Sequence, residues 1–126
     1  MEGKKFATAL NCMDGRVQLP VIEFLKEKYR VDFVDMITEP GMDKLLAEGQ
    51  KEILERIKER IEISVKKHGS QIVAIVGHGD CAGNPVEKKA HLRDIRKGKE
   101  ILESMGFGAK ILGLWVNEDW KAEIVD

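Results

Sequence analysis

No apolar run long enough to cross a membrane occurs in this sequence. A transmembrane helix needs roughly 20 consecutive apolar residues, and no stretch of the 126-residue chain approaches that length. The apolar run that follows the first five residues is also too short for a secretory signal. We therefore expect a soluble, cytoplasmic protein.

An excess of charge of either sign is missing as well. The chain has 21 Lys and Arg against 22 Asp and Glu, a formal net charge of −1, and the two signs are mixed throughout. Without a basic block or an acidic tail, nothing favours a nucleic acid or a membrane as partner. Hydrophobic residues make up 43% of the sequence, and no repeat, linker or low-complexity segment divides it. We expect one globular domain over residues 1–126.

Cysteine is scarce, because only Cys12 and Cys81 occur. In a reducing compartment a structural disulfide is disfavoured, and a pair of cysteines indicates metal binding or catalysis instead. In an exported protein the same pair would suggest a bridge. With no secretory signal in the sequence, the first interpretation is the one we follow.

Strand and helix patterns alternate along the sequence. Short apolar runs predict strands at residues 6–11, 31–38, 71–76 and 109–116, and a short final strand at 120–125. Helical spacing predicts a helix opening near Pro20, a long helical segment at 42–68 that Gly49 could interrupt, and a charged helix at 85–105. This alternation is typical of an α/β fold. We expect a three-layer, doubly wound and mainly parallel sheet with a short C-terminal edge strand.

Three potential metal ligands stand at the ends of two predicted strands. Cys12 closes the first strand, and His78 and Cys81 follow the third. In one common doubly wound order these strands are neighbours, roughly 4.8 Å apart, and ligands bind outside their carboxyl ends. If that order applies, the three side chains could converge on one ion. Two thiolates and one imidazole suit Zn²⁺, with a fourth position left for water or a carboxylate.

Two short segments resemble motifs of the β-class carbonic anhydrases. That family carries Cys-x-Asp-x-Arg after its first strand and His-x-x-Cys after a later central strand. Here residues 12–16 read Cys-Met-Asp-Gly-Arg, and residues 78–81 read His-Gly-Asp-Cys. The resemblance also extends over most of the chain in the order of the elements. It implies a sheet of order 2-1-3-4 with an added edge strand, and assembly as homodimers or higher homo-oligomers.

The same resemblance implies roles for five residues. Cys12, His78 and Cys81 would bind zinc, and Asp14 and Arg16 would form a catalytic dyad beside the metal. The implied activity is zinc-dependent, reversible hydration of CO₂ to bicarbonate by a zinc-bound hydroxide, which is a lyase reaction. Asp14 would accept a hydrogen bond from the hydroxide, and Arg16 would hold Asp14 off the metal. If Asp14 binds zinc instead, the site is closed until Arg16 captures the carboxylate, and the sequence leaves both states open.

The chain departs from the family pattern at three places. Gly15 stands where a small hydroxylated residue or alanine is usual, and Ala82 then Gly83 follow the second cysteine where the family has glycine directly. Residues 38–42 replace the family's Asn-Ala-Gly-Asn segment. Two alternatives therefore stay open. One is a zinc hydrolase acting on COS or CS₂ on the same scaffold, and the other is a non-catalytic domain that binds zinc.

Overall fold

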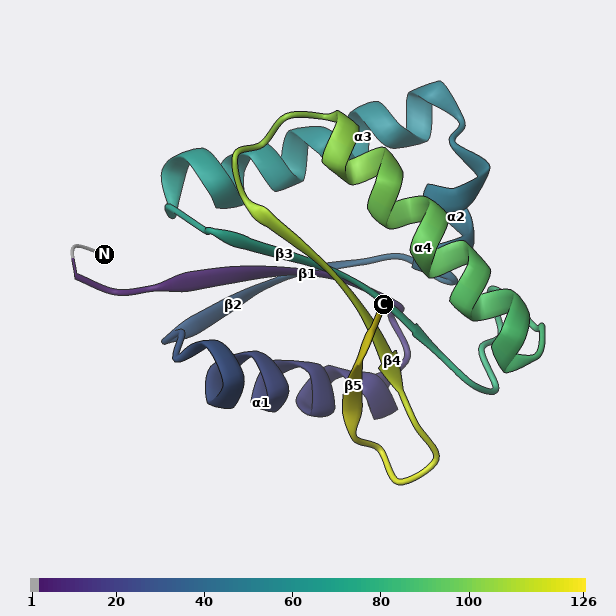
Figure 1. The fold of residues 1–126 in the computed structure, drawn as a ribbon. Coiled ribbons are helices and arrows are strands. Elements are labelled where there is room, and N and C mark those ends of the chain that lie inside the picture. Colours follow the sequence, from purple (N-terminus) through teal and green to yellow (C-terminus); the bar gives the residue numbers. More distant parts are fainter. Residues whose placement is uncertain (1–2) are drawn as a thin grey trace.

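A five-stranded sheet lies between helices on its two faces (Figure 1). The structure, a computed structural model, describes residues 3–126. The strands are β1 (Phe6–Asn11), β2 (Phe33–Thr38), β3 (Ile72–His78), β4 (Lys110–Val116) and β5 (Ala122–Val125). The longer helices are α1 (Gln18–Tyr29), α2 (Met42–Glu48), α3 (Lys51–Glu62) and α4 (Lys88–Ser104). A 3₁₀ turn, η1 (Gly15–Val17), precedes α1, and a π-helical turn, η2 (Ile63–Lys67), follows α3.

The strand order is β2-β1-β3-β4-β5, which confirms the order 2-1-3-4 with an added edge strand. The first four strands are parallel, and β5 runs antiparallel to β4. Pairing of β1 with β3 extends only from Thr8 to Leu10, so these two strands part before they reach their carboxyl ends. Every residue of β1 is buried, as expected of a strand covered on both faces.

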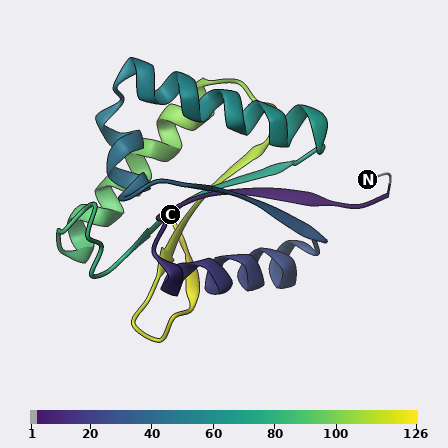
Figure 2. The same ribbon diagram turned by 180° about the vertical axis from the view of Figure 1, so that it is seen from behind.

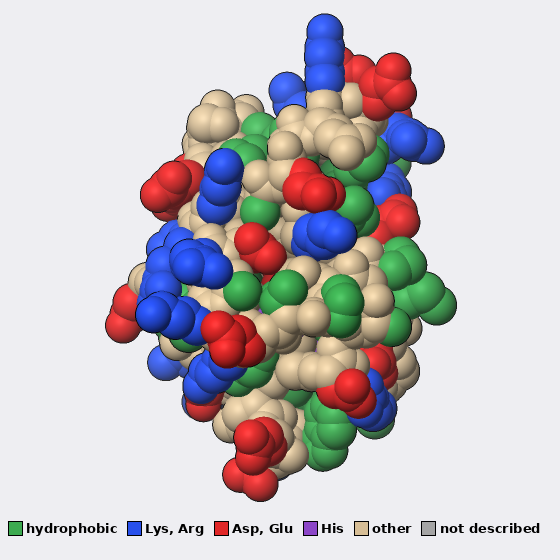
Figure 3. Space-filling model, turned by 90° about the vertical axis from the view of Figure 1, so that its right-hand side faces the viewer, with side chains coloured by type: hydrophobic (Ala, Val, Ile, Leu, Met, Phe, Trp, Pro, Cys, Tyr) green, Lys and Arg blue, Asp and Glu red, His purple; other side chains and the backbone are tan. Residues whose placement is uncertain are grey.

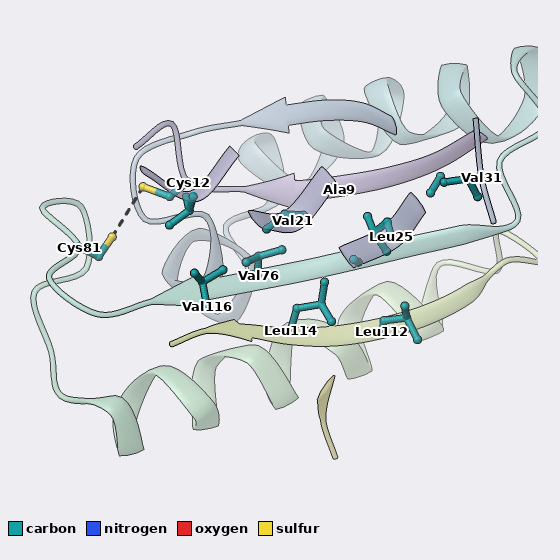
Figure 4. Packing of buried hydrophobic residues seen from close by; sticks show 13 residues of the cluster. Ala9, Cys12, Val21, Leu25, Val31, Val76, Cys81, Leu112, Leu114 and Val116 are labelled. Atoms are coloured by element: carbon teal, nitrogen blue, oxygen red, sulfur yellow. Dashed lines mark hydrogen bonds between the residues drawn. The ribbon is translucent and has the colours of Figure 1, made fainter. Parts of the chain in front are cut away.

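The helices form two outer layers, which confirms the three-layer fold. Helix α1 covers one face of the sheet, and α2, α3 and α4 cover the other (Figures 1 and 2). Alternate strand residues supply the two cores, because successive side chains point to opposite faces. Ala9 and Val76 pack with Leu25 of α1 (Figure 4), whereas Leu10 and Ile75 pack with the helices of the other layer.

Several element boundaries differ from the prediction. The helical segment at 42–68 is divided at Gly49, as the sequence allowed, because Gly49 ends α2 in the left-handed conformation (φ +67°), but the segment finishes in a π-helical turn. The helix predicted from residue 85 begins at Lys88, because residues before it form the loop around the candidate site. The last strand begins at Ala122, since Trp120 lies in the preceding turn with φ +58°.

The surface carries both signs of charge, as the composition implies. Figure 3 looks onto the edge where the parallel strands end, and acidic and basic side chains are interspersed across it. Within residues 3–126, no helix combines the length and the apolar character needed to cross a membrane.

Candidate metal centre

The structure brings the three candidate metal ligands together at the carboxyl ends of β1 and β3. Cys12 directly follows β1, His78 is the last residue of β3, and Cys81 lies in the next loop. All three side chains are buried, and their ligand atoms lie within 4.8 Å of one another. Figure 4 shows Cys12 and Cys81 facing each other from the two chain segments. The convergence follows from the strand order, because β1 and β3 are neighbours despite the 60 or more residues between them.

The two sulfur atoms have the spacing of a shared metal site. Both cysteines are free, and the Cys12 Sγ–Cys81 Sγ distance is 3.8 Å. A disulfide would need about 2.05 Å. Two sulfurs each about 2.3 Å from a tetrahedral zinc ion lie about 3.8 Å apart. The spacing therefore fits two ligands of one tetrahedral ion.

The His78 ring is oriented with one nitrogen left free. Its Nδ1 lies 2.7 Å from the carbonyl oxygen of Gly79. A carbonyl only accepts, so Nδ1 carries the proton and Nε2 keeps its lone pair. Nε2 is buried and has no hydrogen-bond partner among the described residues. A buried polar atom without a partner costs about 1–3 kcal/mol, and a metal ligand whose other nitrogen bonds a backbone carbonyl has this arrangement.

The Cys81 thiol is held in its neutral form when no cation is bound. Burial raises its pKa, and the neighbouring Cys12 thiol raises it further. Backbone N–H groups of Asn84 and Gly83 act in the opposite direction and favour the thiolate. A divalent cation between the sulfurs would reverse the balance, because a coordinating thiol loses its proton. Metal binding at this site would therefore release protons.

Asp14 and Arg16 form a bidentate pair beside the cysteines. Arg16 Nη2 donates to Asp14 Oδ2 at 2.7 Å, and Arg16 Nε donates to Asp14 Oδ1 at 3.0 Å. The backbone N–H of Arg16 also donates to Asp14 Oδ1 at 2.9 Å, so Asp14 caps the turn η1. These hydrogen bonds from Arg16 lower the pKa of Asp14 to about 2. Asp14 is therefore ionised at neutral pH, and its orientation is fixed by Arg16.

Arg16 has two further partners that the sequence did not reveal. Its Nη1 donates to Asp80 Oδ2 at 3.2 Å, and its Nη2 donates to the Asp80 carbonyl at 3.1 Å. Its guanidinium carbon lies 5.1 Å from the centre of the Trp120 ring, a cation–π contact. Asp80 and Trp120 both have positive φ, at 53° and 58°. Positive φ is uncommon outside glycine, but Arg30 at the end of α1 shares it, so it does not by itself mark a functional residue.

Two hollows meet at the Arg16 side chain. The smaller, of about 470 Å³, is lined by Asp14, Arg16, Asp80 and Cys81, with Ala82, Pro85 and Val86. The larger, of about 770 Å³, is also lined by Arg16 and Asp80. Its other lining residues include Trp115, Trp120 and Lys88. The smaller hollow therefore borders both Cys81 and the Asp14 carboxylate.

Residues 2–126 match the family described as "Putative carbonic anhydrase". The chain belongs to this family. The match spans nearly the whole sequence. No curated protein matches the chain.

Solved carbonic anhydrases share the fold. One from Glaciozyma antarctica has a TM-score of 0.62 and 14% identity, covering 94% of this chain and 81% of its own. One of two tetrameric β-carbonic anhydrases from Sordaria macrospora has a TM-score of 0.59 and 12% identity, covering 98% and 82%. A β-carbonic anhydrase of Aspergillus fumigatus has a TM-score of 0.53 and 16% identity, covering 98% and 77%. At these identities the likeness establishes the fold alone.

Two departures from the β-carbonic anhydrase pattern are in contact with each other. A Cβ atom on Gly83 would lie 2.5 Å from the backbone nitrogen of Gly41, and one on Gly41 would lie 2.6 Å from the Gly83 carbonyl. The loop after β2 therefore packs backbone against backbone on the loop that carries Cys81. Only glycine fits at either position, so the changes in residues 38–42 and at 82–83 belong to one packing arrangement.

Proposed function

We propose that the chain is a zinc-dependent carbonic anhydrase that interconverts CO₂ and bicarbonate. The observation that carries the proposal is the unpartnered, buried Nε2 of His78 beside two free sulfurs 3.8 Å apart. Cys12, His78 and Cys81 would hold the metal. Membership of the carbonic anhydrase family and the fold of its solved relatives support this assignment.

The residues around the ligands suit this reaction. Bound zinc would supply a nucleophile near neutral pH, because it lowers the pKa of a coordinated water by several units. Asp14, ionised and partly buried, would accept a hydrogen bond from that nucleophile and fix its direction. Arg16 binds both oxygens of Asp14 and would keep the carboxylate off the metal. A planar guanidinium does this better than an ammonium, because it offers two parallel donors.

We further propose that the protein assembles as a homo-oligomer. Apolar side chains are exposed near the mouth of the site: Met13 is 62% exposed, Val86 41% and Trp120 41%. Apolar residues gathered beside a functional site are typical of a protein interface, and a relative from Sordaria macrospora is described as tetrameric. Light scattering on the purified protein would give the mass of the assembly.

The redox state of the two cysteines bears on where the protein works. Two thiols 3.8 Å apart stay available as metal ligands only while reduced, which favours the cytoplasm.

The first experiment is elemental analysis of protein purified under reducing conditions, followed by CO₂ hydration kinetics. We expect about one zinc per chain, loss of zinc in Cys81→Ser, and hydration well above the buffer rate. Absence of zinc after reconstitution would refute the proposal.

The same preparation separates the two alternatives. A zinc-loaded protein whose CO₂ hydration rate stays at background, unchanged by Arg16→Ala, would be a non-catalytic zinc-binding domain. Faster turnover of COS or CS₂ than of CO₂ would indicate the related hydrolase.

A further inference from the structure

A second polar cluster is buried behind the loop that carries Cys81. Asp43 of α2, Asn84 of the loop and His91 of α4 are 2%, 3% and 0% exposed. They lie where α2 and α4 meet, beside the core that includes Ile75 and Ile95. Buried polar groups are costly unless they are paired. None of the three belongs to the candidate metal ligands or to the Asp14–Arg16 pair, so the cluster needs an explanation of its own.

The cluster is a hydrogen-bonded network around the Asp43 carboxylate, in which the buried His91 Nε2 has no hydrogen-bond partner among the described residues. Oδ2 of Asp43 accepts from His91 Nδ1 at 2.6 Å. Oδ1 accepts from the backbone N–H of Lys44 at 2.9 Å and from Asn84 Nδ2 at 3.2 Å. The second amide hydrogen of Asn84 is directed to Asp94 Oδ2 at 3.0 Å. Both hydrogens of the Asn84 amide are therefore used, and the side chain has one preferred orientation.

The network touches both ends of the segment that carries two of the three proposed metal ligands. A Cβ atom on Gly77 would lie 2.8 Å from Asp43 Oδ2, so the carboxylate packs directly on the backbone next to His78. At the other end, Asn84 is three residues beyond Cys81, and its backbone N–H donates to the Cys81 carbonyl at 3.3 Å. The network therefore contacts the backbone just before His78 and, through Asn84, the backbone just after Cys81.

We propose that Asn84, oriented by Asp43 and His91, is a positioning residue for the metal centre. It fixes residues 78–84 so that the Cys81 sulfur and the His78 ring face Cys12 before a metal binds. A loop already held in its bound shape loses less conformational entropy on binding. Substitution of a residue that supports a metal ligand commonly lowers metal affinity 10–100-fold. The inference rests on the proposed function only in taking Cys12, His78 and Cys81 as ligands, and its measurement is metal affinity, not turnover.

The test compares zinc affinities by competition with a chromophoric chelator. Asn84→Ala removes both amide donors, and we expect binding 10–100-fold weaker than in the wild type. Asn84→Ser keeps one short donor, and we expect an intermediate affinity. The thiolate-to-metal absorption of the Co²⁺-loaded protein should weaken in the same order, because it reports how firmly Cys81 is placed.

Ser64→Ala is the matched control. Ser64 is 2% exposed and hydrogen-bonds Thr8 and Asp35 near the other end of the sheet. The Ser64→Ala substitution removes a buried hydrogen-bonding group without touching residues 78–84, so zinc affinity should stay within about twofold of wild type.

Equal affinity in Asn84→Ala and wild type would overturn the inference, as would an equal loss in Ser64→Ala, which would trace the effect to general stability. If Asn84→Ala does not fold, Asn84→Ser decides by the same comparison. Failure of the wild type to bind zinc would instead refute the proposed function, and the inference with it.

Discussion

Replacing Gly83 with alanine would push two loop backbones apart. A Cβ atom at position 83 would lie 2.5 Å from the nitrogen of Gly41 and 2.5 Å from the carbonyl carbon of Pro40. Carbon atoms in contact normally stay about 3.5–4.0 Å apart, so the loops must separate by about 1 Å. Backbone atoms cannot rotate out of the way as the end of a side chain can. We therefore expect the cost of an over-packed core, about 1–3 kcal/mol of unfolding free energy.

The assay is urea unfolding of the metal-free protein with excess chelator, followed by circular dichroism. The midpoint should fall while the slope of free energy against urea stays unchanged, because the amount of surface exposed on unfolding is the same. Gly15→Ala is the matched control: a Cβ atom there meets nothing within 4 Å, so stability should stay within about 0.5 kcal/mol. Equal midpoints for Gly83→Ala and wild type would show that the close loop contact is not present in solution.

Three further predictions concern Arg16, Asp14 and Arg30. Arg16→Ala should keep its zinc, by elemental analysis, yet lose about 10²-fold or more in CO₂ hydration, by stopped flow; an unchanged rate would remove Arg16 from the mechanism. The pKa of Asp14 is about 2 in the folded protein and 3.8 ordinarily, so its stabilising effect is complete above pH 3.8 and disappears towards pH 2. Urea unfolding of metal-free wild type and Asp14→Asn should accordingly differ by at most about 1 kcal/mol at neutral pH and converge in acid; a gap that widens in acid would contradict this. Arg30 ends α1 with φ +56°, so Arg30→Gly should raise the unfolding free energy by about 1 kcal/mol, and a lower melting temperature would count against the strain.

The sheet and the three-residue cluster could be predicted because their signals are local. Apolar runs mark each strand, and Cys12 and His78 stand at strand ends, which a parallel sheet gathers on one edge. The strand order itself came from a resemblance, since periodicity says nothing about which strands are neighbours. Once the order is given, the meeting of Cys12 with Cys81 follows from geometry.

The supporting contacts could not be predicted, because they join residues far apart in the sequence. Asp43 and His91 are 48 positions apart, and Arg16 and Asp80 are 64 apart. No spacing rule connects such pairs. The helical pattern of residues 85–105 placed His91 on a charged helix, but its burial depends on how α4 packs against α2. Trp120 was likewise predicted only as the start of the final strand, and its position over Arg16 depends on the fold.

The early parting of β1 and β3 gives a bound ion a mechanical role. Backbone pairing between these central strands stops at Leu10 and Ile75, and beyond that point no ladder hydrogen bond joins them. Cys12 lies just beyond the end of β1, whereas His78 ends β3 and Cys81 lies in the loop after it. An ion held by all three residues would link the two strands beyond the point at which their backbone pairing stops. Release of the ion would remove this link, while the pairing at Thr8–Leu10 keeps β1 and β3 together.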